Sequence, residues 1–204
     1  LHLSIRRQRQ MCIRDRTSAP LLECKNALQE AGGDIDKAIE ILKIKGLSKV
    51  EKKSGRNTPE GQIFSYIHAG GKIGVLVEIN CETDFVARND EFQLFAREIA
   101  MQIAASDPHF VSKGDIPESF IENEKKVILA QVEESGKKPE VVEKMIEGKL
   151  NKRLEEVSLL DQIYIRDSKL KIEDLQNEIV SKLGENIKIS RFVRYQIGET
   201  QTDD

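Results

Sequence analysis

The sequence predicts an α+β protein, in which a small helical N-terminal domain precedes a core of about three antiparallel strands packed with helices. Two apolar runs, 63–67 and 73–79, are rich in β-branched and aromatic residues, and glycines separate them. This pattern is typical of a β-hairpin. Directly after the hairpin, apolar residues recur at helical spacing between 92 and 103, which predicts a core helix.

The N-terminal part divides into a tail and a helical domain. Residues 1–13 are basic, lack acids and show neither a helical nor a strand period, so we interpret them as a doubtful or non-native tail. Residues 14–46 are expected to form the helical domain. Asp34 is placed to cap its second recognisable helix, and Gly46 to close that helix. Two short helices need a third to form a core, but no period marks the first helix.

Residues 47–60 are interpreted as a basic linker. The stretch 43–56 carries six basic residues among glycines and serines. A nucleic-acid-binding patch is the alternative, but the stretch has no aromatic residues on which bases could stack.

The core is assigned to residues 61–199, followed by a polar tail at 200–204. Two charged amphipathic stretches, 119–135 and 139–157, predict an antiparallel helical hairpin hinged at 136–138. A further helix is expected over 172–183, with Gly184 at its end. The final strand, from Ile187 to Ile197, places apolar residues on one face and completes a sheet of about three strands.

Composition limits the function. Charged residues make up 33% and hydrophobic residues 39% of the 204 residues, which is typical of a soluble globular protein. No apolar run approaches the ~20 residues of a membrane helix. A net charge of −3 favours a protein partner over nucleic acid. Three cysteines without CxxC spacing predict neither a disulfide framework nor a zinc site, and a reducing cytoplasm fits best.

An enzyme is one alternative that the residues allow. Cys81 is a possible thiol nucleophile, with His68 as base and Glu82 or Asp84 as the orienting acid. However, Cys81 and His68 fall at opposite ends of one predicted strand, which rises roughly 3.3 Å per residue. A buried structural cysteine is therefore the favoured interpretation of Cys81.

Cofactor and metal sites are not predicted. Gly70, Gly71 and Gly74 lie within a hairpin, and no helix N-terminus follows them to hold a phosphate. His2 and His109 have no partners at ligand spacing. We therefore expect no cofactor and no bound metal.

A large aromatic residue stands beside an acid where the second strand gives way to a helix. Such an aromatic anchors an interface when it is exposed. From the residues alone, however, the favoured interpretation is that Phe85 is a core aromatic and that Asp84 caps the following helix. Asn89 is a second candidate cap, and Arg88 a candidate for an ion pair within the domain.

The run NCETDFVARN at 80–89 resembles the core of the bacterial translation elongation factor Ts family. The resemblance covers roughly residues 14–199. It rests on several further motifs, which are Tyr66-Ile67-His68, Gly70-Gly71, Cys24-Lys25-Asn26-Ala27-Leu28, Gly33-Asp34-Ile35-Asp36-Lys37-Ala38 and Arg191-Phe192-Val193-Arg194-Tyr195.

The resemblance implies a function and reverses the interpretation of Phe85. It implies a ubiquitin-associated-like fold for residues 14–46. It also implies that the protein is a guanine-nucleotide exchange factor for elongation factor Tu, and such a factor makes and breaks no covalent bond. The implied partner-binding residues, which enter elongation factor Tu beside its magnesium site, are Thr83, Asp84, Phe85 and Val86. Arg88 and Asn89 would support them.

The resemblance also bears on assembly and location. The length allows one core module, as in short forms, which could pair as a non-covalent homodimer. The expected compartment is the bacterial cytoplasm, and an organelle is the lesser alternative. No contact with nucleic acid or membrane is expected. A rival interpretation is an adaptor that binds ubiquitin-like folds through the N-terminal helices.

Overall fold

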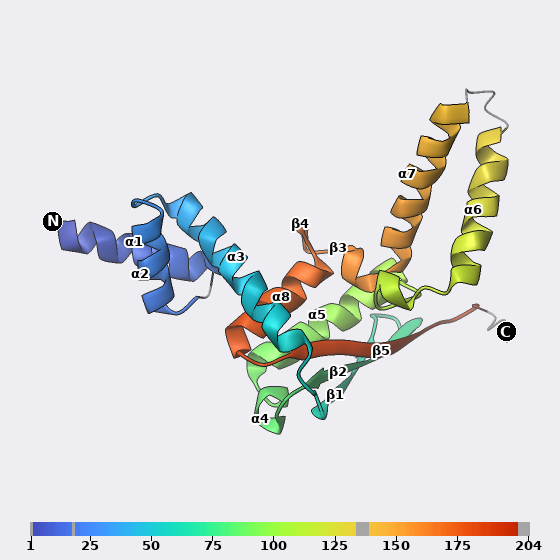
Figure 1. Ribbon diagram of the computed structural model, residues 1–204. Coiled ribbons are helices and arrows are strands. Elements are labelled where there is room, and N and C mark those ends of the chain that lie inside the picture. Colours follow the sequence, from blue (N-terminus) through green and yellow to red (C-terminus); the bar gives the residue numbers. More distant parts are fainter. Residues whose placement is uncertain (1, 18, 134–138, 200–204) are drawn as a thin grey trace. The chain divides into compact units, whose positions relative to one another are not determined.

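The computed structural model describes residues 2–17, 19–133 and 139–199 (Figure 1). The chain packs as two compact units. The first unit contains the chain up to Gly61 together with Asn80–Phe92 and Gln176–Lys188. The second contains Gln62–Ile79, Gln93–Leu175 and the chain from Ile189 onward. The segment that carries Phe85 therefore packs in the unit of the N-terminal helices, although the sequence places it in the core.

The elements follow one another as helices, a hairpin, helices and a final strand. Their bounds are α1 (His2–Thr17), α2 (Leu21–Glu30), α3 (Ile35–Ser54), β1 (Glu60–Ile67), β2 (Ile73–Cys81), α4 (Asp84–Ala87), α5 (Asp90–Ser106), η1 (Lys113–Asp115), α6 (Glu118–Glu133), α7 (Pro139–Val157), η2 (Leu159–Asp161), β3 (Ile163–Tyr164), β4 (Asp167–Lys171), α8 (Ile172–Leu183) and β5 (Ile187–Gln196).

Helix α1 occupies the stretch that the sequence suggests is a tail. Its Ile13 is fully buried and joins the core that α1, α2 and α3 share. The other members of that core are Cys24, Ala27, Leu28, Ala38, Ile39 and Leu42. Ile13 is the one buried side chain described in α1, so the sequence shows no apolar period there.

Helix α3 is longer than the sequence predicts. Asp34 caps it as expected, because its carboxylate accepts hydrogen bonds from the backbone amides of Asp36 (3.0 Å) and Lys37 (3.1 Å). The helix then continues through Gly46 to Ser54, so the first half of the expected linker 47–60 is helical. Gly46 does not end the helix. A Cβ there would lie 3.4 Å from Ser181 Oγ, an ordinary van der Waals distance, so the packing at this position does not require glycine.

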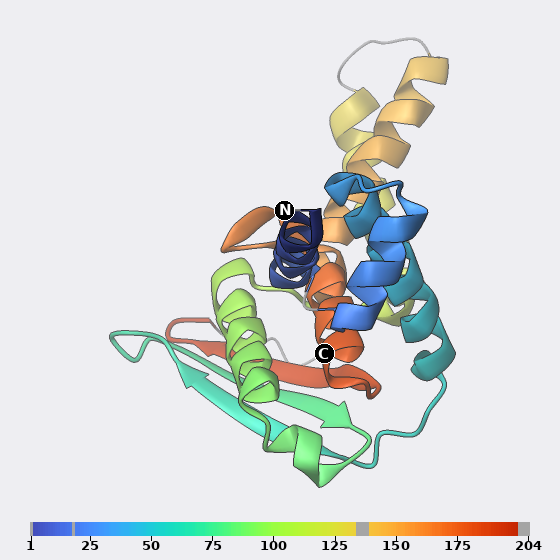
Figure 2. The same ribbon diagram turned by 90° about the vertical axis from the view of Figure 1, so that its left-hand side faces the viewer.

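The larger sheet has three strands, as predicted, and their order is β1-β2-β5. The β1–β2 turn is closed by a 2.9 Å hydrogen bond from His68 N to Ile73 O, and Gly70 and Gly71 supply positive φ angles of 90° and 68°. Helix α5 lies over one face of the sheet (Figure 2). The buried residues on these two elements include Val75, Val77 and Ile79 of β2 and Phe95, Ile99 and Ile103 of α5. The α+β fold class is confirmed.

Helices α6 and α7 form the predicted hairpin and project together in Figure 1. Ile128 and Leu150 are buried between them, and Ile121, Met145 and Leu154 pack around this pair. The predicted hinge 136–138 lies outside the described residues, as does the polar tail 200–204.

A second hairpin, β3–β4, is absent from the sequence prediction. Its short strands carry no alternating apolar pattern. The hairpin is held by side chains of α5. Buried Gln102 donates to Ile163 O (3.1 Å) and accepts from Ile165 N (2.9 Å). Glu98 accepts a 2.5 Å hydrogen bond from the hydroxyl of Tyr164 and pairs with Arg166 at 3.0 Å. Burial and this hydrogen bond raise the pKa of Tyr164 to about 12.

Replacing Tyr164 tests this attachment. Tyr164→Phe should cost about 1.5 kcal/mol at neutral pH, the typical contribution of a hydrogen bond to a charged group. The raised pKa adds a pH effect. In the unfolded chain the tyrosine ionises near its ordinary pKa, so the unfolded state binds fewer protons between pH about 10 and about 12. The free energy of unfolding should fall with pH across that window, and less steeply in Tyr164→Phe.

Urea denaturation at several pH values measures both effects. Tyr195→Phe is the matched control, because Tyr195 is exposed and should leave the neutral-pH stability unchanged. Identical pH slopes for the wild type and Tyr164→Phe would contradict the assignment.

Candidate partner-binding site

The candidate site begins where β2 ends. Cys81, the last residue of β2, is fully buried, and Ala87 at the end of α4 is also buried. These two residues anchor a loop and a single helical turn between them. Asn89 then helps to start the next helix, because its side-chain oxygen accepts a 2.8 Å hydrogen bond from Glu91 N.

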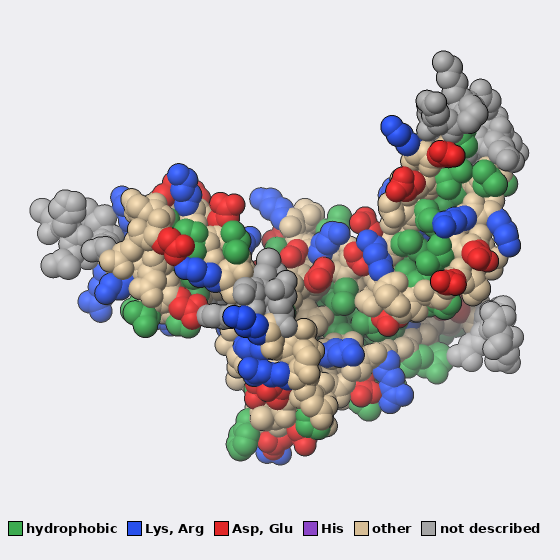
Figure 3. Space-filling view, viewed as in Figure 1, with side chains coloured by type: hydrophobic (Ala, Val, Ile, Leu, Met, Phe, Trp, Pro, Cys, Tyr) green, Lys and Arg blue, Asp and Glu red, His purple; other side chains and the backbone are tan. Residues whose placement is uncertain are grey.

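Phe85 points away from the core. Its side chain is 82% exposed, while the neighbouring Val86 is half-buried. Figure 3 shows hydrophobic side chains at the surface where α4 lies, beside acidic and basic ones. The interpretation of Phe85 as a core aromatic is therefore wrong. The exposed benzyl group gains little free energy of burial within this chain, so that free energy remains available for binding another protein.

Asp84 and Arg88 form an ion pair across the one turn of α4. The carboxylate and guanidinium lie 3.1 Å apart, and their side chains are 46% and 79% exposed. A pair with this exposure contributes only about 0.3–0.5 kcal/mol. Little free energy is therefore lost if the carboxylate of Asp84 leaves this pair to bind a partner. The residues alone suggested that Asp84 caps the following helix, but it does not cap α5.

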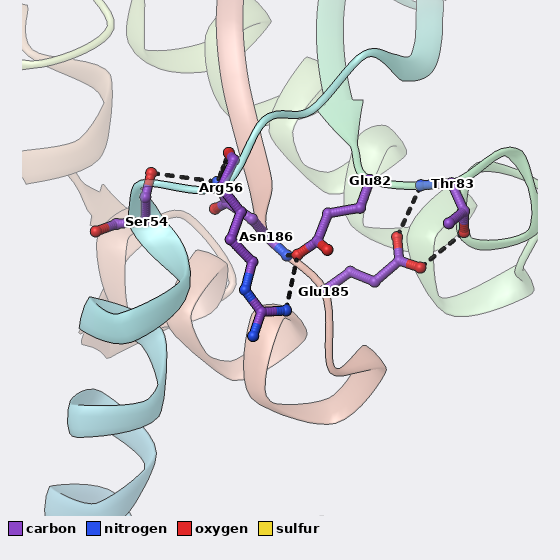
Figure 4. A network of polar contacts seen from close by, with 6 residues as sticks. All are labelled: Ser54, Arg56, Glu82, Thr83, Glu185 and Asn186. Atoms are coloured by element: carbon purple, nitrogen blue, oxygen red, sulfur yellow. Dashed lines mark hydrogen bonds and ion pairs between the residues drawn. The ribbon is translucent and has the colours of Figure 1, made fainter.

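Thr83 lies at the N-cap of α4, but its hydroxyl makes no cap hydrogen bond. Instead the Thr83 hydroxyl donates to Glu185 Oε1 at 2.7 Å, and the Thr83 backbone amide donates to Glu185 Oε2 at 3.0 Å (Figure 4). Both oxygens of one carboxylate thus hold one residue. Thr83 O in turn accepts from the thiol of Cys81 at 3.1 Å.

A second set of contacts joins the same two segments, with the acceptor carboxylate now on the segment after β2. Glu82 accepts a 2.7 Å hydrogen bond from Asn186 N, and also pairs with Arg56 at 3.4 Å. The side-chain amide of buried Asn186 donates to the carbonyl oxygens of Ser54 (3.3 Å) and Arg56 (2.9 Å). The end of α3, the end of β2 and the turn before β5 are therefore joined in one polar network (Figure 4).

Cys81 is unsuited to nucleophilic chemistry. Burial raises the pKa of its thiol, and the nearby Glu185 carboxylate raises it further, so the thiol stays protonated at neutral pH. The described side-chain hydrogen bond of His68 joins its Nδ1 to the hydroxyl of Tyr66, at 3.1 Å. The thiol-enzyme alternative therefore gains no support.

The described residues contain no group of three or more His, Cys, Asp or Glu side chains that could hold a metal ion. Among the same residues, no helix combines the length and apolar character that crossing a membrane requires.

Comparison with known proteins decides the family. The model of the family described as "Elongation factor TS" matches residues 22–199 of this chain. The chain belongs to the elongation factor Ts family. The resemblance that the sequence motifs predict is therefore confirmed. The matched stretch includes the whole of the candidate site and omits α1.

Elongation factor Ts proteins of several bacteria are similar to this chain. The one from Carboxydothermus hydrogenoformans is 54% identical over 187 residues, which are 92% of this chain and 86% of the relative. The one from Thermotoga petrophila is 53% identical over 192 residues, or 94% and 95%. The one from Caldanaerobacter subterraneus is 52% identical over 187 residues, or 92% and 94%.

Sequence reasoning missed the residues that support the site. Glu185 and Thr83 are 102 positions apart, so no local pattern connects them. Glu82, Asn186 and Arg56 are also joined only by the fold. The one available signal was Gly184, whose positive φ of 81° ends α8 and marks a turn directly before Glu185.

Proposed function

We propose that this protein is a guanine-nucleotide exchange factor for elongation factor Tu. The observation that carries the proposal is the exposed side chain of Phe85, held on a single anchored turn beside the weakly paired Asp84. Family membership supports the choice of partner.

Exchange requires no covalent chemistry from this chain. A factor that binds the nucleotide-free state of its partner more tightly than the GDP-bound state must, by linkage, lower the partner's affinity for GDP by the same factor. The necessary tool is a side chain that fits only when the nucleotide site is distorted.

Phe85 and Asp84 are suited to that task. Burial of a phenylalanine side chain contributes about 1.5–3 kcal/mol, enough to shift a two-state packing arrangement in the partner. The carboxylate of Asp84 would then compete for the polar neighbours of the partner's magnesium ion. Thr83 and Val86 flank these two residues in the proposed partner-binding segment, and Arg88 and Asn89 support it.

Location and other partners follow from the same proposal. A factor that serves bacterial translation works in the cytoplasm, and needs no contact with nucleic acid or membrane. The adaptor alternative would place the binding surface on α1–α3 instead. No contact among the described residues favours it over exchange.

Loss of the aromatic ring tests the exchange mechanism. Phe85→Ala should lower the rate of GDP release from elongation factor Tu at saturating factor by at least about tenfold, the equivalent of about 1.4 kcal/mol. The fold should survive, because the ring packs little within this chain. Stopped-flow fluorescence with labelled GDP measures the rate. Ile165→Ala removes another exposed apolar side chain, and serves as the control with unchanged exchange. A wild-type rate for Phe85→Ala would contradict the proposal.

A non-covalent homodimer is a second proposal, supported by the open face of the sheet. Ile67 packs beside Gly74 on this face, and the 2.7 Å bond from Arg191 to Glu78 places Arg191 on it too, and by alternation also Tyr195. The exposed apolar residues that share the face by this alternation are Ile63, Ile67, Leu76 and Tyr195. An apolar patch on a sheet face is suited to pairing with a copy of itself.

Sedimentation velocity tests this pairing. The wild type should sediment as a dimer at micromolar concentration, and Ile67→Glu should shift it to a monomer because a charge would enter the apolar contact. Ile44→Glu, at an exposed position of α3, should stay dimeric. A monomeric wild type would refute the homodimer and leave the exchange proposal unaffected.

A further inference from the structure

We propose that Glu185 is the positioning residue for Phe85: by holding Thr83, its carboxylate fixes the direction in which α4 presents the ring to the partner. The inference rests on the proposed exchange function, but concerns a residue outside the contact surface. Glu185 itself is half-buried, and its described hydrogen bonds go to Thr83.

Glu185 holds Thr83 by two hydrogen bonds. A threonine at an N-cap normally accepts a hydrogen bond from an amide of the first helical turn. Here the hydroxyl instead donates to Glu185 at 2.7 Å, while the amide of Thr83 donates to the second oxygen at 3.0 Å. Two parallel bonds to one carboxylate define an orientation, whereas a single bond would allow rotation.

Glu185 is itself held in place by its neighbours in the chain. Gly184 turns the chain sharply after α8. Asn186, the residue after Glu185, is buried. Its backbone amide donates a hydrogen bond to Glu82, and its side-chain amide donates to carbonyl oxygens at the end of α3. The arrangement is reciprocal. Glu82 holds the amide of Asn186, and Glu185 holds the amide of Thr83 (Figure 4).

Helix α4 needs support from outside the helix. It has four residues, and a helix of that length does not persist by itself in water. Phe85 is too exposed to orient the turn by packing, and the ion pair between Asp84 and Arg88 is a weak surface pair. Ala87 anchors the far end of the turn, so Thr83 is the end at which direction is set.

The kinetic consequence differs from that of losing the ring. If α4 samples several directions, only a fraction of the free factor is competent to bind, and the half-saturating concentration rises by the inverse of that fraction. Once bound, the turn adopts the productive direction, so the rate at saturation is retained. Removal of Phe85 has the opposite pattern, because it affects the saturating rate.

The experiment measures GDP release from elongation factor Tu over a range of concentrations of the full-length factor. Glu185→Ala should raise the half-saturating concentration by at least about tenfold, the equivalent of one lost hydrogen bond to a carboxylate, with little change in the saturating rate. Glu185→Gln should remain within about threefold of the wild type, because an amide can still accept from Thr83 N and donate to the hydroxyl.

Two further variants separate positioning from general stability and from direct contact. Glu173→Ala removes an exposed carboxylate from the first turn of α8 and should match the wild type. Thr83→Val, combined with Glu185→Ala, should behave like Glu185→Ala alone, because the hydroxyl that valine removes bonds to the carboxylate that is already lost.

Three results would overturn the inference. These are an unchanged half-saturating concentration for Glu185→Ala, an equal loss in Glu185→Gln, and a drop in the saturating rate like that of Phe85→Ala. The wild-type curve separates the two proposals. If the unmodified factor does not accelerate GDP release, the exchange function fails. If it does and Glu185→Ala shows any of these results, only the positioning role fails.

Discussion

Both oxygens of the Glu185 carboxylate bind Thr83, one at its hydroxyl and one at its backbone amide, and the site depends on this contact. Charge-assisted hydrogen bonds of this kind are among the strongest polar contacts available to a protein. This one joins residues 102 positions apart and holds the chain between the end of β2 and the start of α4. Without such a contact, an exposed turn of four residues would have no fixed direction.

The site combines firmly held neighbours with loosely held functional groups. Cys81 and Ala87 are buried on either side of the turn, and Glu82 and Asn186 are tied into the network. Phe85 and Asp84, in contrast, have little to lose within this chain. A binding segment built in this way incurs a small entropic cost on association, because its backbone is already ordered. In the proposed complex, the exposed ring and carboxylate would therefore keep nearly all their interaction energy for the partner.

Much of the fold was predictable because its determinants are local. The β1–β2 hairpin follows from two β-branched runs around Gly70 and Gly71, and α5 follows from its apolar period. The end of α8 follows from Gly184. These patterns need only neighbouring residues, and the structure contains all three elements.

The elements that the sequence did not predict depend on distant residues. Helix α1 buries one described side chain, Ile13, so it shows no period. Helix α3 continues through Gly46 to Ser54, and Asn186, which is distant in sequence, bonds to the carbonyl oxygens of Ser54 and Arg56 at its end. The β3–β4 hairpin is held by Gln102 of another element.

The same distinction applies to the site. The motif at 80–89 identified the segment, but the residues alone suggested that Phe85 was buried. A local pattern cannot tell whether an aromatic ring has partners elsewhere in the fold. Glu185 was missed for the same reason, since its role exists only through a long-range contact.

The central claim is that the ring at position 85 enters the nucleotide-binding domain of elongation factor Tu. Photo-crosslinking tests it most directly, with p-benzoylphenylalanine in place of Phe85 and nucleotide-free elongation factor Tu as the target. Mass spectrometry of the cross-linked peptides should locate the bond in the nucleotide-binding domain, close to the magnesium site, and added GDP should reduce its yield. A cross-link confined to another domain, or a yield that GDP does not change, would contradict the account.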